Sequence, residues 1–388
     1  MNILIFGMGY VGTSIGLLLS RKNSVTLVDI DEEKVVNFGN GLLPISDKFG
    51  EEYFRNNKIN INAVTADKVN YDKFNLVIIA TPTDFDTNKG EFDTSSVENI
   101  IENVQNFSRE LPVLIKSTVP IGFTSKMNKE FRTEMVLFSP EFLREGNAVY
   151  DNFYPSRIII GGRRDLSEAI AGLFLECSEF DEVPMCFCKT DEAEAIKLLT
   201  NTYLAARVSF FNEIDSMCMQ RNLSTKDVID GICLDQRIGN YYNNPSFGFG
   251  GYCLPKDSKQ AAREFRDLDS PLIDSINKSN DSRKKNIIEN ISKMQVKTIG
   301  IYKLAMKKDS DNFRSSAIID ILKGLSMNGF DIIIYDQTLR NSEFMGYSIV
   351  SDLDEFKKRA DLIVCNRFDE GLSAVEAKVF SRDIYGYL

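Results

Sequence analysis

The sequence predicts an α/β protein in which two α/β segments flank a long central helix. Short apolar runs alternate with polar or helix-like segments in the first half, which is typical of a mainly parallel sheet. Residues 192–220 contain no Gly or Pro and repeat apolar side chains every three or four residues, as a helix does. Apolar runs return after residue 292. We therefore expect three segments, 1–190, 191–291 and 292–388, which suits a chain of 388 residues.

The individual elements follow from the same periodicities. The first segment should hold a helix at 11–20 and strands at 2–6, 25–29, 76–80, 113–116, 135–138 and 157–160. The last segment should hold strands at 298–302, 331–335 and 361–365 and helices at 314–328 and 352–359. Two α/β halves of similar architecture are thus expected at the two ends of the chain.

Composition excludes several classes of protein. The net charge of -10 would repel nucleic acid and anionic membranes, so an anionic substrate must be met by local Lys and Arg. There is no apolar run of membrane-spanning length and no basic signal-peptide flank, and the seven cysteines form no CxxC pair. We expect a cytoplasmic protein without metal. Because histidine is absent, acid/base chemistry falls to Lys, Asp, Glu, Cys or water.

A glycine-rich turn joins the first expected strand to the first expected helix. Gly7-Met-Gly9-Tyr-Val-Gly12 has the GxGxxG spacing that lets the backbone approach a pyrophosphate at a helix N-terminus. The motif alone could be an ordinary turn. Asp29, however, closes the second strand, where a carboxylate binds a ribose 2'-hydroxyl and would repel a 2'-phosphate. The sequence therefore predicts a Rossmann domain that binds NAD rather than NADP.

Two further polar segments each follow an expected strand. They are 81–83, Thr-Pro-Thr, and 117–122, Ser-Thr-Val-Pro-Ile-Gly. The carboxyl ends of parallel strands are where such sheets bind ligands. Each segment could equally be a turn that only ends its strand.

Cys253 stands apart from the other six cysteines. It follows a glycine- and aromatic-rich segment and precedes a helix-like run that begins with Pro255, which places the thiol just before a helix N-terminus. The partial positive charge there, together with Lys256, would favour the thiolate. The remaining cysteines are interpreted as small buried hydrophobes. Cys253 is therefore the candidate nucleophile.

At this segment the chain resembles the UDP-glucose/GDP-mannose dehydrogenase family. The motifs that carry the resemblance occur in the family's order along most of the chain: Gly7–Gly12, Ser117-Thr-Val-Pro120, Ser139-Pro-Glu-Phe-Leu-Arg-Glu-Gly146, Glu194-Ala-Ile-Lys-Leu-Leu-Thr-Asn201 and Gly250-Gly-Tyr-Cys-Leu-Pro-Lys-Asp257. The likeness is greatest to short bacterial members that act on UDP-glucose. Residues 85–88, Phe-Asp-Thr-Asn in place of a second proline, and residues 302–308 depart from the usual family patterns, which affects loop shape.

The resemblance implies an NAD domain, a central helix used in a homodimer, and a UDP-binding domain. It also implies four-electron oxidation of the sugar CH2OH to a carboxylate, with two NAD consumed and the aldehyde captured on Cys253. A thiohemiacetal donates hydride readily, so capture both retains and activates the intermediate. Lys197 and Asn201, four apart on one helix face, could together stabilise the alkoxide, although such a pair could also be a solvated face.

The remaining site residues are implied by the resemblance. Catalysis would also use Asp257, to hold water or pair with Lys197, and Thr118 and Glu145, with the identity of the general base left open. The cofactor would contact Gly7, Gly9, Tyr10, Val11, Gly12, Asp29, Lys34, Thr83, Thr118, Glu145, Lys256 and Arg314. The substrate would contact Glu141, Phe142, Leu143, Arg144, Lys197, Asn201, Arg237, Tyr241, Tyr242, Asn243, Gly250 and Lys303.

Other functions were weighed against this one. A single-step hydroxyacid dehydrogenase also joins a Rossmann domain to a long helix, but it needs no nucleophilic thiol. A dinucleotide-sensing binding protein would be free to lose Thr118, Lys197, Cys253 and Asp257, which are all present. Within the family, UDP-N-acetylmannosamine, UDP-N-acetylglucosamine or GDP-mannose remain alternatives to UDP-glucose as substrate.

Overall fold

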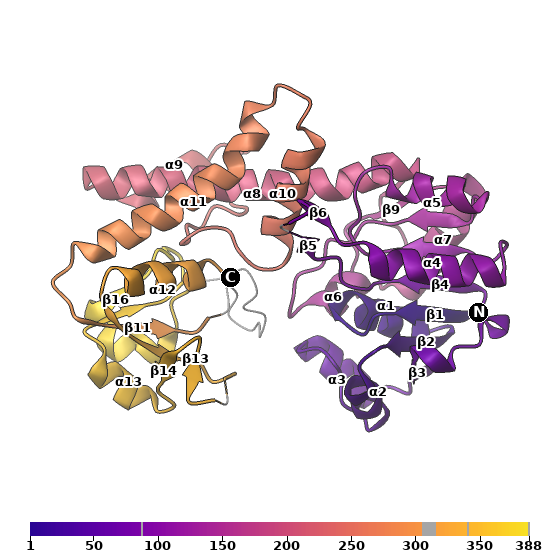
Figure 1. The fold of residues 1–388 in the computed structure, drawn as a ribbon, viewed down its shortest axis with the longest axis horizontal. Helices are drawn as coiled ribbons and strands as arrows, with labels where there is room; N and C mark the ends of the chain where they lie inside the picture. The colour runs from indigo at the N-terminus through magenta and orange to yellow at the C-terminus, as the bar shows by residue number, and fades with distance from the viewer. Residues whose placement is uncertain (87, 305–315, 340, 387–388) are drawn as a thin grey trace. The chain divides into compact units, whose positions relative to one another are not determined.

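The computed structural model describes residues 1–86, 88–304, 316–339 and 341–386. The chain forms two compact units, Met1–Leu199 and Thr200–Leu388 (Figure 1). Within the described residues, none of the helices has both the length and the apolar character that crossing a membrane requires.

The first unit is built on an eight-stranded sheet with the order β10-β9-β8-β7-β4-β1-β2-β3. Its strands are β1 (Asn2–Phe6), β2 (Ser24–Asp29), β3 (Ile61–Thr65), β4 (Leu76–Ile79), β7 (Val113–Ile115), β8 (Val136–Phe138), β9 (Ile158–Gly161) and β10 (Met185–Cys188). Neighbouring strands are parallel except β8 and β9. The strand order reverses between β1 and β4, which is where sheets of this kind form a ligand crevice. An antiparallel pair, β5 (Phe85–Asp86) and β6 (Glu91–Phe92), follows β4.

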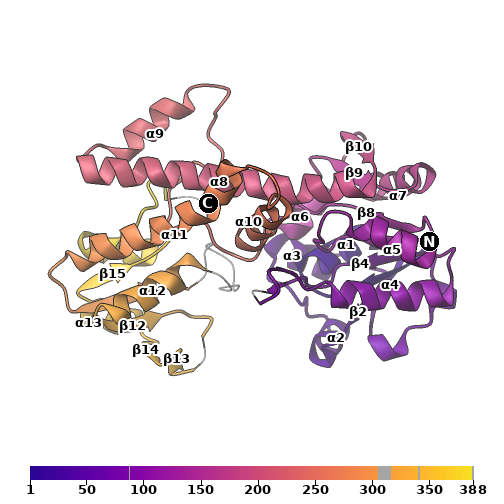
Figure 2. The same ribbon diagram turned by 45° about the horizontal axis from the view of Figure 1, so that its top comes forward.

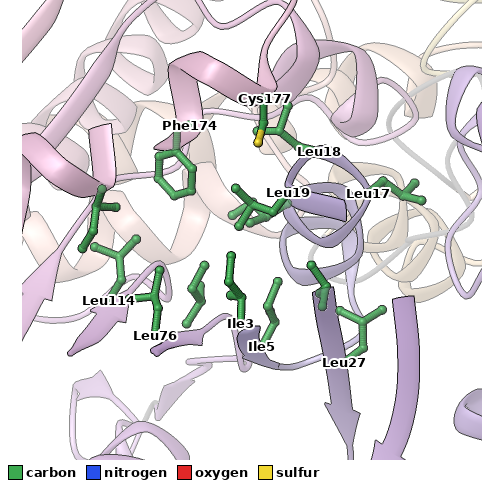
Figure 3. Packing of buried hydrophobic residues seen from close by; sticks show 14 of the residues in the cluster. Ile3, Ile5, Leu17, Leu18, Leu19, Leu27, Leu76, Leu114, Phe174 and Cys177 are labelled. Carbon is green, nitrogen blue, oxygen red and sulfur yellow. The ribbon is translucent and has the colours of Figure 1, made fainter. Parts of the chain in front are cut away.

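Helices cover both faces of this sheet because every internal strand is apolar on both sides. Ile3 and Ile5 of β1 face one core, and Leu4 and Phe6 face the other. The first core contains side chains of α1 (Tyr10–Ser20), α6 (Ala148–Phe153) and α7 (Arg164–Cys177), and Figure 3 shows Leu17 to Leu19 and Phe174 over the strands. The second core contains α4 (Ser95–Phe107) and α5 (Phe123–Phe131). Continuous apolar strands of this kind are typical of buried parallel sheets.

Smaller helices complete the first unit. They are α2 (Glu32–Gly39), α3 (Lys48–Asn56) and the short 3-10 turns η1 (Ala66–Lys68) and η2 (Tyr71–Lys73). Asp31 caps α2 by accepting from the backbone of Glu33 and Lys34, and Asp47 caps α3 at Gly50. These carboxylates satisfy amide groups that have no partner inside their own helix.

The long helix expected at 192–220 is present as α8 (Thr190–Arg221), two residues longer at its start and one at its end (Figure 2). It is followed by α9 (Thr225–Cys233), α10 (Cys253–Glu264) and α11 (Pro271–Ser292). The sequence pattern did not predict α11. Two of its buried positions are Asn280 and Arg283, so its apolar periodicity is interrupted.

A second sheet, in the order β13-β14-β12-β11-β15-β16, lies in the second unit. Its strands are β11 (Thr298–Tyr302), β12 (Asp331–Tyr335), β13 (Glu343–Phe344), β14 (Tyr347–Ile349), β15 (Leu362–Val364) and β16 (Val379–Phe380), and only β13 and β14 pair antiparallel. Helices α12 (Ala317–Met327) and α13 (Leu353–Arg359) and the 3-10 segment η3 (Glu370–Lys378) pack around it. The expected helix 314–328 therefore holds from 317 onward, and Arg314 lies outside the described residues.

Candidate active site

The three glycines of the turn after β1 have different surroundings. Gly7 has a φ of 100°, and a Cβ there would lie 2.5 Å from the carbonyl oxygen of Ala80, at the end of β4. A Cβ on Gly12 would lie 1.8 Å from the carbonyl oxygen of Gly7. At Gly9, by contrast, a Cβ would meet no atom within 4 Å. Two glycines therefore close the turn, and the third leaves open space at the start of α1 for a ligand phosphate.

Asp29 ends β2 as expected. Its two carboxylate oxygens accept hydrogen bonds from the amides of Met8 (2.8 Å) and Asp31 (3.1 Å). The first of these bonds ties the carboxylate to the glycine turn itself. Glycine turn and carboxylate thus fit an NAD dinucleotide, with Asp29 placed to accept from a ribose hydroxyl. Lys34, in the first turn of α2, is half-buried.

The polar segments after β4 and β7 are bound to each other. Thr83, which is buried, donates from its hydroxyl to the carbonyl of Thr118 at 2.6 Å. Ser117 donates to the carbonyl of Thr81 at 2.7 Å. These two segments, which could each have been a plain turn, therefore form one structure at the carboxyl edge of the sheet, beside the point where the strand order reverses.

A cluster of charged groups lies at the ends of β7 and β8. Glu141 is buried, and its carboxylate forms an ion pair of 3.3 Å with the ammonium of Lys116. The ammonium of Lys197, which is also buried, donates to the backbone carbonyl of Glu141. This contact uses one of the three N–H donors of the Lys197 ammonium. Burial lowers the pKa of Lys116, and the Glu141 carboxylate opposes the shift.

Glu194, three residues before Lys197 on α8, has no solvent exposure. Its carboxylate accepts hydrogen bonds from the amides of Gly122 (2.6 Å) and Thr124 (2.8 Å), so it occupies the N-terminus of α5. Burial raises the pKa of Glu194 to about 7, and hydrogen bonds from Thr124 and Gly122 act against that rise. The segment that carries Thr118 is therefore fixed to α8 by a buried carboxylate.

The segment 142–145 is more open. The Phe142 ring is half-buried and lies 4.0 Å from the guanidinium carbon of Arg157. Arg144 is exposed and forms an ion pair of 2.6 Å with Asp151. Leu143 and Glu145 are half-buried.

In the second unit, Cys253 is the first residue of α10 and is exposed. The helix begins two residues earlier than Pro255 predicted, because Tyr252 and the residues that follow already have helical backbone angles. Lys256, expected beside the thiol, lies in the first turn of the same helix and is buried. Its ammonium lies 3.0 Å from the Asp257 carboxylate, so its charge is engaged there.

Asp257 is fully buried one helical turn after Cys253. Besides Lys256, it accepts a hydrogen bond of 2.5 Å from the side-chain amide of Asn201 on α8. Asp257 thus holds Asn201 and Lys256, two of the expected site residues, and its observed cationic partner is Lys256. Among the described residues, no group of three or more Cys, Asp or Glu is arranged to hold a metal ion.

The glycine loop before Cys253 is clamped by α11. Asn280 accepts from the amide of Phe249 (2.7 Å) and donates to the carbonyl of the same residue (2.9 Å). Arg283 donates to the carbonyl of Ser246 at 2.9 Å and pairs with the buried Asp215. Gly248 has a φ of 144° and its position leaves no room for a Cβ against Asn280.

The expected substrate residues of the second unit differ in solvent exposure and in their contacts. Arg237 and Tyr241 are strongly exposed, and Arg237 is paired with Asp235 at 2.6 Å. Tyr242 has a φ of 51°, and Asn243 is buried against the sulfur of Cys233. Gly250 lies in the loop before Cys253, and Lys303, with a φ of 59°, pairs with Asp369 at 2.7 Å.

Four buried polar residues of these clusters were not identified from the sequence as parts of a site: Lys116, Glu194, Asn280 and Arg283. A signal existed for Lys116, a lysine that closes an apolar strand, and for Glu194, which lies inside a quoted motif. Asn280 and Arg283 carried none, because a polar residue in a helix is ordinarily interpreted as solvent-facing.

Comparison with known proteins agrees with this architecture. Models of the UDP-glucose/GDP-mannose dehydrogenase family match residues 1–174 (NAD binding domain), 191–282 (central domain) and 300–384 (UDP binding domain). The chain therefore belongs to the UDP-glucose/GDP-mannose dehydrogenase family, whose members are NAD-dependent oxidoreductases of nucleotide sugars.

Individual relatives cover the whole chain. It is 45% identical to the UDP-glucose 6-dehydrogenase of Campylobacter jejuni over 99% of both chains, and 43% identical to the UDP-glucose 6-dehydrogenase of Streptococcus pneumoniae over 100% of both. Its fold is similar to a UDP-glucose dehydrogenase from Pyrobaculum islandicum, with a TM-score of 0.86 at 22% identity, covering 99% of this chain and 95% of that one. The family prediction and the α/β fold are confirmed.

Proposed function

We propose that this dehydrogenase oxidises UDP-glucose to UDP-glucuronate through a covalent adduct on Cys253. The observation that carries the proposal is the exposed thiol at the first residue of α10, with the buried Asp257 one turn further on. Two relatives with the name UDP-glucose 6-dehydrogenase, at 45% and 43% identity over the full chain, support UDP-glucose as the sugar nucleotide.

The proposed reaction runs in three stages. Bound NAD would supply the hydride acceptor for each of the two oxidations. The first oxidation converts the CH2OH to an aldehyde, and the Cys253 thiolate adds to the aldehyde carbon to give a thiohemiacetal. Loss of the second hydride leaves a thioester, and water then cleaves the carbon–sulfur bond to release the carboxylate and the thiol. The thiol retains the aldehyde and makes it a hydride donor.

Lys197 and Asn201 are the proposed donors to the oxygen that develops negative charge. Both are buried on α8. Thr118, Glu145 and Asp257 are the proposed residues for proton and water handling, in a protein without histidine. Support comes from the hydrogen bond that Asp257 accepts from Asn201, since a carboxylate fixed by a neighbour can orient water.

The proposed NAD contacts in the first unit are Gly7, Gly9, Tyr10, Val11, Gly12, Asp29, Lys34 and Thr83, with Lys256 and Arg314 from the second unit. The proposed substrate contacts are Glu141 to Arg144, Arg237, Tyr241 to Asn243, Gly250 and Lys303. The open space beside Gly9 and the position of Asp29 at the glycine turn support the cofactor assignment.

The test is turnover with a panel of four sugar nucleotides: UDP-glucose, UDP-N-acetylmannosamine, UDP-N-acetylglucosamine and GDP-mannose. We expect UDP-glucose to give two NADH per molecule, with UDP-glucuronate as product and no free aldehyde. One NADH per sugar, or release of the aldehyde, would refute covalent capture. Preference for another sugar nucleotide of the panel would show that the proposed substrate is wrong, and would not contradict covalent capture on Cys253.

We also propose a homodimer formed through α8. Leu199, Tyr203, Phe210 and Met217 are exposed and recur at spacings of four and seven residues, which places large apolar side chains along one side of the helix. A two-fold dimer is the commonest way to cover such a surface. Light scattering at low micromolar concentration should give a dimer, and Phe210→Glu should shift it toward monomer. A fully active wild-type monomer would refute the proposal.

A cytoplasmic location is proposed as well. All seven cysteines lie in the described residues and are free thiols. Proteins of oxidising compartments ordinarily pair such residues. Fractionation of the native host that placed the protein outside the cytoplasm would contradict this location.

A further inference from the structure

Lys116 is a buried lysine that none of the proposed catalytic steps uses. It follows β7 directly, and its ammonium meets three acceptors, all in the segment that follows the neighbouring strand β8. These are the Ser139 hydroxyl (3.2 Å), the Pro140 carbonyl (3.2 Å) and the Glu141 carboxylate (3.3 Å). The side chain is 8% exposed, so it contacts the protein interior and not the solvent.

A lysine in this setting is unusual, since removing an ammonium from water is costly unless its contacts compensate. Lysine is almost never fully buried without a partner. Burial lowers the pKa of Lys116, the nearby Lys197 lowers it further, and Glu141 is the group that acts in the opposite direction. The Glu141 carboxylate is therefore the group that compensates for the burial of the Lys116 ammonium.

The position of Glu141 is determined from three sides. Its carboxylate accepts from the amide of Phe142 at 2.7 Å and pairs with Lys116, and its carbonyl accepts from Lys197. The two carboxylate oxygens thus have different partners, Oε1 on the backbone and Oε2 on Lys116. A rotation of the carboxylate would break both contacts.

We propose that Lys116 is a positioning residue for the reaction, which holds the Glu141 carboxylate in its working orientation. The inference rests on the proposed function to the extent that Glu141 is taken as a substrate contact. Lys116 itself contacts neither substrate nor cofactor in this proposal; it acts through Glu141. Its loss should therefore reduce turnover and leave NAD binding intact, because the glycine turn and Asp29 share none of its hydrogen-bond or ion-pair partners.

The experiment is a double-mutant cycle of Lys116→Met and Glu141→Gln, with kcat measured at saturating UDP-glucose and NAD affinity measured by fluorescence titration. Misplacement of a reacting group by about 1 Å costs about 100-fold in rate, so we expect kcat of Lys116→Met to fall by about 100-fold. NAD affinity should stay within about twofold of the wild type. Lys129→Met, which removes an exposed lysine from α5, is the control and should change neither quantity.

The cycle distinguishes positioning from general support of the fold. If Lys116 acts through Glu141, the double variant should have the kcat of Glu141→Gln within about twofold. The double variant also covers the case in which Lys116→Met fails to fold, because it removes both members of the buried pair and leaves no unpaired charge. A double variant about 100-fold slower than Glu141→Gln would overturn the inference.

Failure of the proposed function gives a different result. If wild-type protein does not oxidise UDP-glucose, the proposed substrate is wrong, and the same cycle is run with the sugar nucleotide of the panel that it does oxidise. Independent effects of the two substitutions on that substrate would still overturn the positioning role, and coupled effects would support it.

Discussion

Two glycine-rich loops in this protein lead into helix N-termini, and they are built in different ways. The turn before α1 is closed by backbone contacts, since a Cβ on Gly7 or Gly12 would collide with a carbonyl oxygen. The loop before α10 is held from outside, by Asn280 and Arg283 of α11. The first leaves the helix start open for a phosphate, and the second presents the Cys253 thiol. A backbone-closed turn can be recognised in a local motif, whereas a clamped loop depends on a distant helix.

The largest effect is expected at the backbone-closed turn. Gly12→Ala places a Cβ 1.8 Å from the Gly7 carbonyl, so the turn must open and NAD affinity should fall by about 100-fold, with a loss of stability of about 1–3 kcal/mol. Isothermal titration with NAD and urea unfolding measure the two effects.

Gly9→Ala and Gly172→Ala are the matched variants, because neither Cβ would meet an atom within 4 Å. Gly9→Ala should keep stability and lose NAD affinity, whereas Gly172→Ala, on the exposed surface of α7, should keep both. Normal NAD binding by Gly12→Ala would show that the turn is not the cofactor site.

The N-terminus of α5 is occupied by a carboxylate of the protein itself, that of Glu194. The free energy of unfolding should therefore depend on pH, by about 3 kcal/mol in total. The pKa of Glu194 is raised from 4.5 to about 7, so between these values the folded state binds the proton more tightly than the unfolded state. This contribution to stability is fully present below pH 4.5 and is lost as pH rises through about 7, at about 1.4 kcal/mol per unit.

The measurement compares urea unfolding of wild type and Glu194→Gln at pH 5 and pH 8. The free energy of unfolding of the wild type should fall relative to the variant by on the order of 3 kcal/mol over that range. Glu192 is exposed on the same helix, and the free energy of unfolding of Glu192→Gln should change with pH as that of the wild type does. If the free energies of unfolding of Glu194→Gln and the wild type changed equally with pH, the folded-state pKa of Glu194 would not be raised.

The smallest effect is expected at the clamped loop. Asn280→Ala leaves the amide and carbonyl of Phe249 without their side-chain partners, which should cost about 1–3 kcal/mol of stability. We expect kcat to fall by about tenfold because the loop before Cys253 loosens, with NAD affinity unchanged. Urea unfolding and steady-state kinetics test this, with Ser282→Ala on the exposed side of α11 as the control. An unchanged kcat would show that the hydrogen bonds between Asn280 and the loop are not needed for catalysis.

The parts of the fold that the sequence predicted are those set by local pattern. Short apolar strands, the period of α8 and the GxGxxG turn each depend on residues near in sequence, and all appear within two residues of the expected bounds. Strand β3 was missed because the polar Asn62 interrupts its apolar run, and β10 was missed although its four residues are all apolar, because a run of four is too short to distinguish a strand by periodicity. Helix α11 was missed because the polar residues Asn280 and Arg283 occupy two of its buried positions and interrupt the apolar periodicity.

The sequence predicted which residues belong to the candidate site, but not which of them contact one another. The sequence indicated Lys197, Asn201 and Asp257, yet their observed contacts join residues far apart in the chain: Lys197 contacts the Glu141 carbonyl, and Asn201 contacts Asp257. Such pairings follow from the order of strands in the sheet and from helix packing. Periodicity cannot supply either.

The covalent role of Cys253 is tested most directly by intact mass spectrometry of Cys253→Ser incubated with NAD and UDP-glucose. An ester on serine is a poorer acyl donor to water than a thioester, so the adduct should persist. The account predicts a protein whose mass is increased by the UDP-glucuronyl group, and Cys253→Ala should bind NAD and UDP-glucose but form no adduct and no UDP-glucuronate. Production of UDP-glucuronate by Cys253→Ala at the wild-type rate would contradict the account.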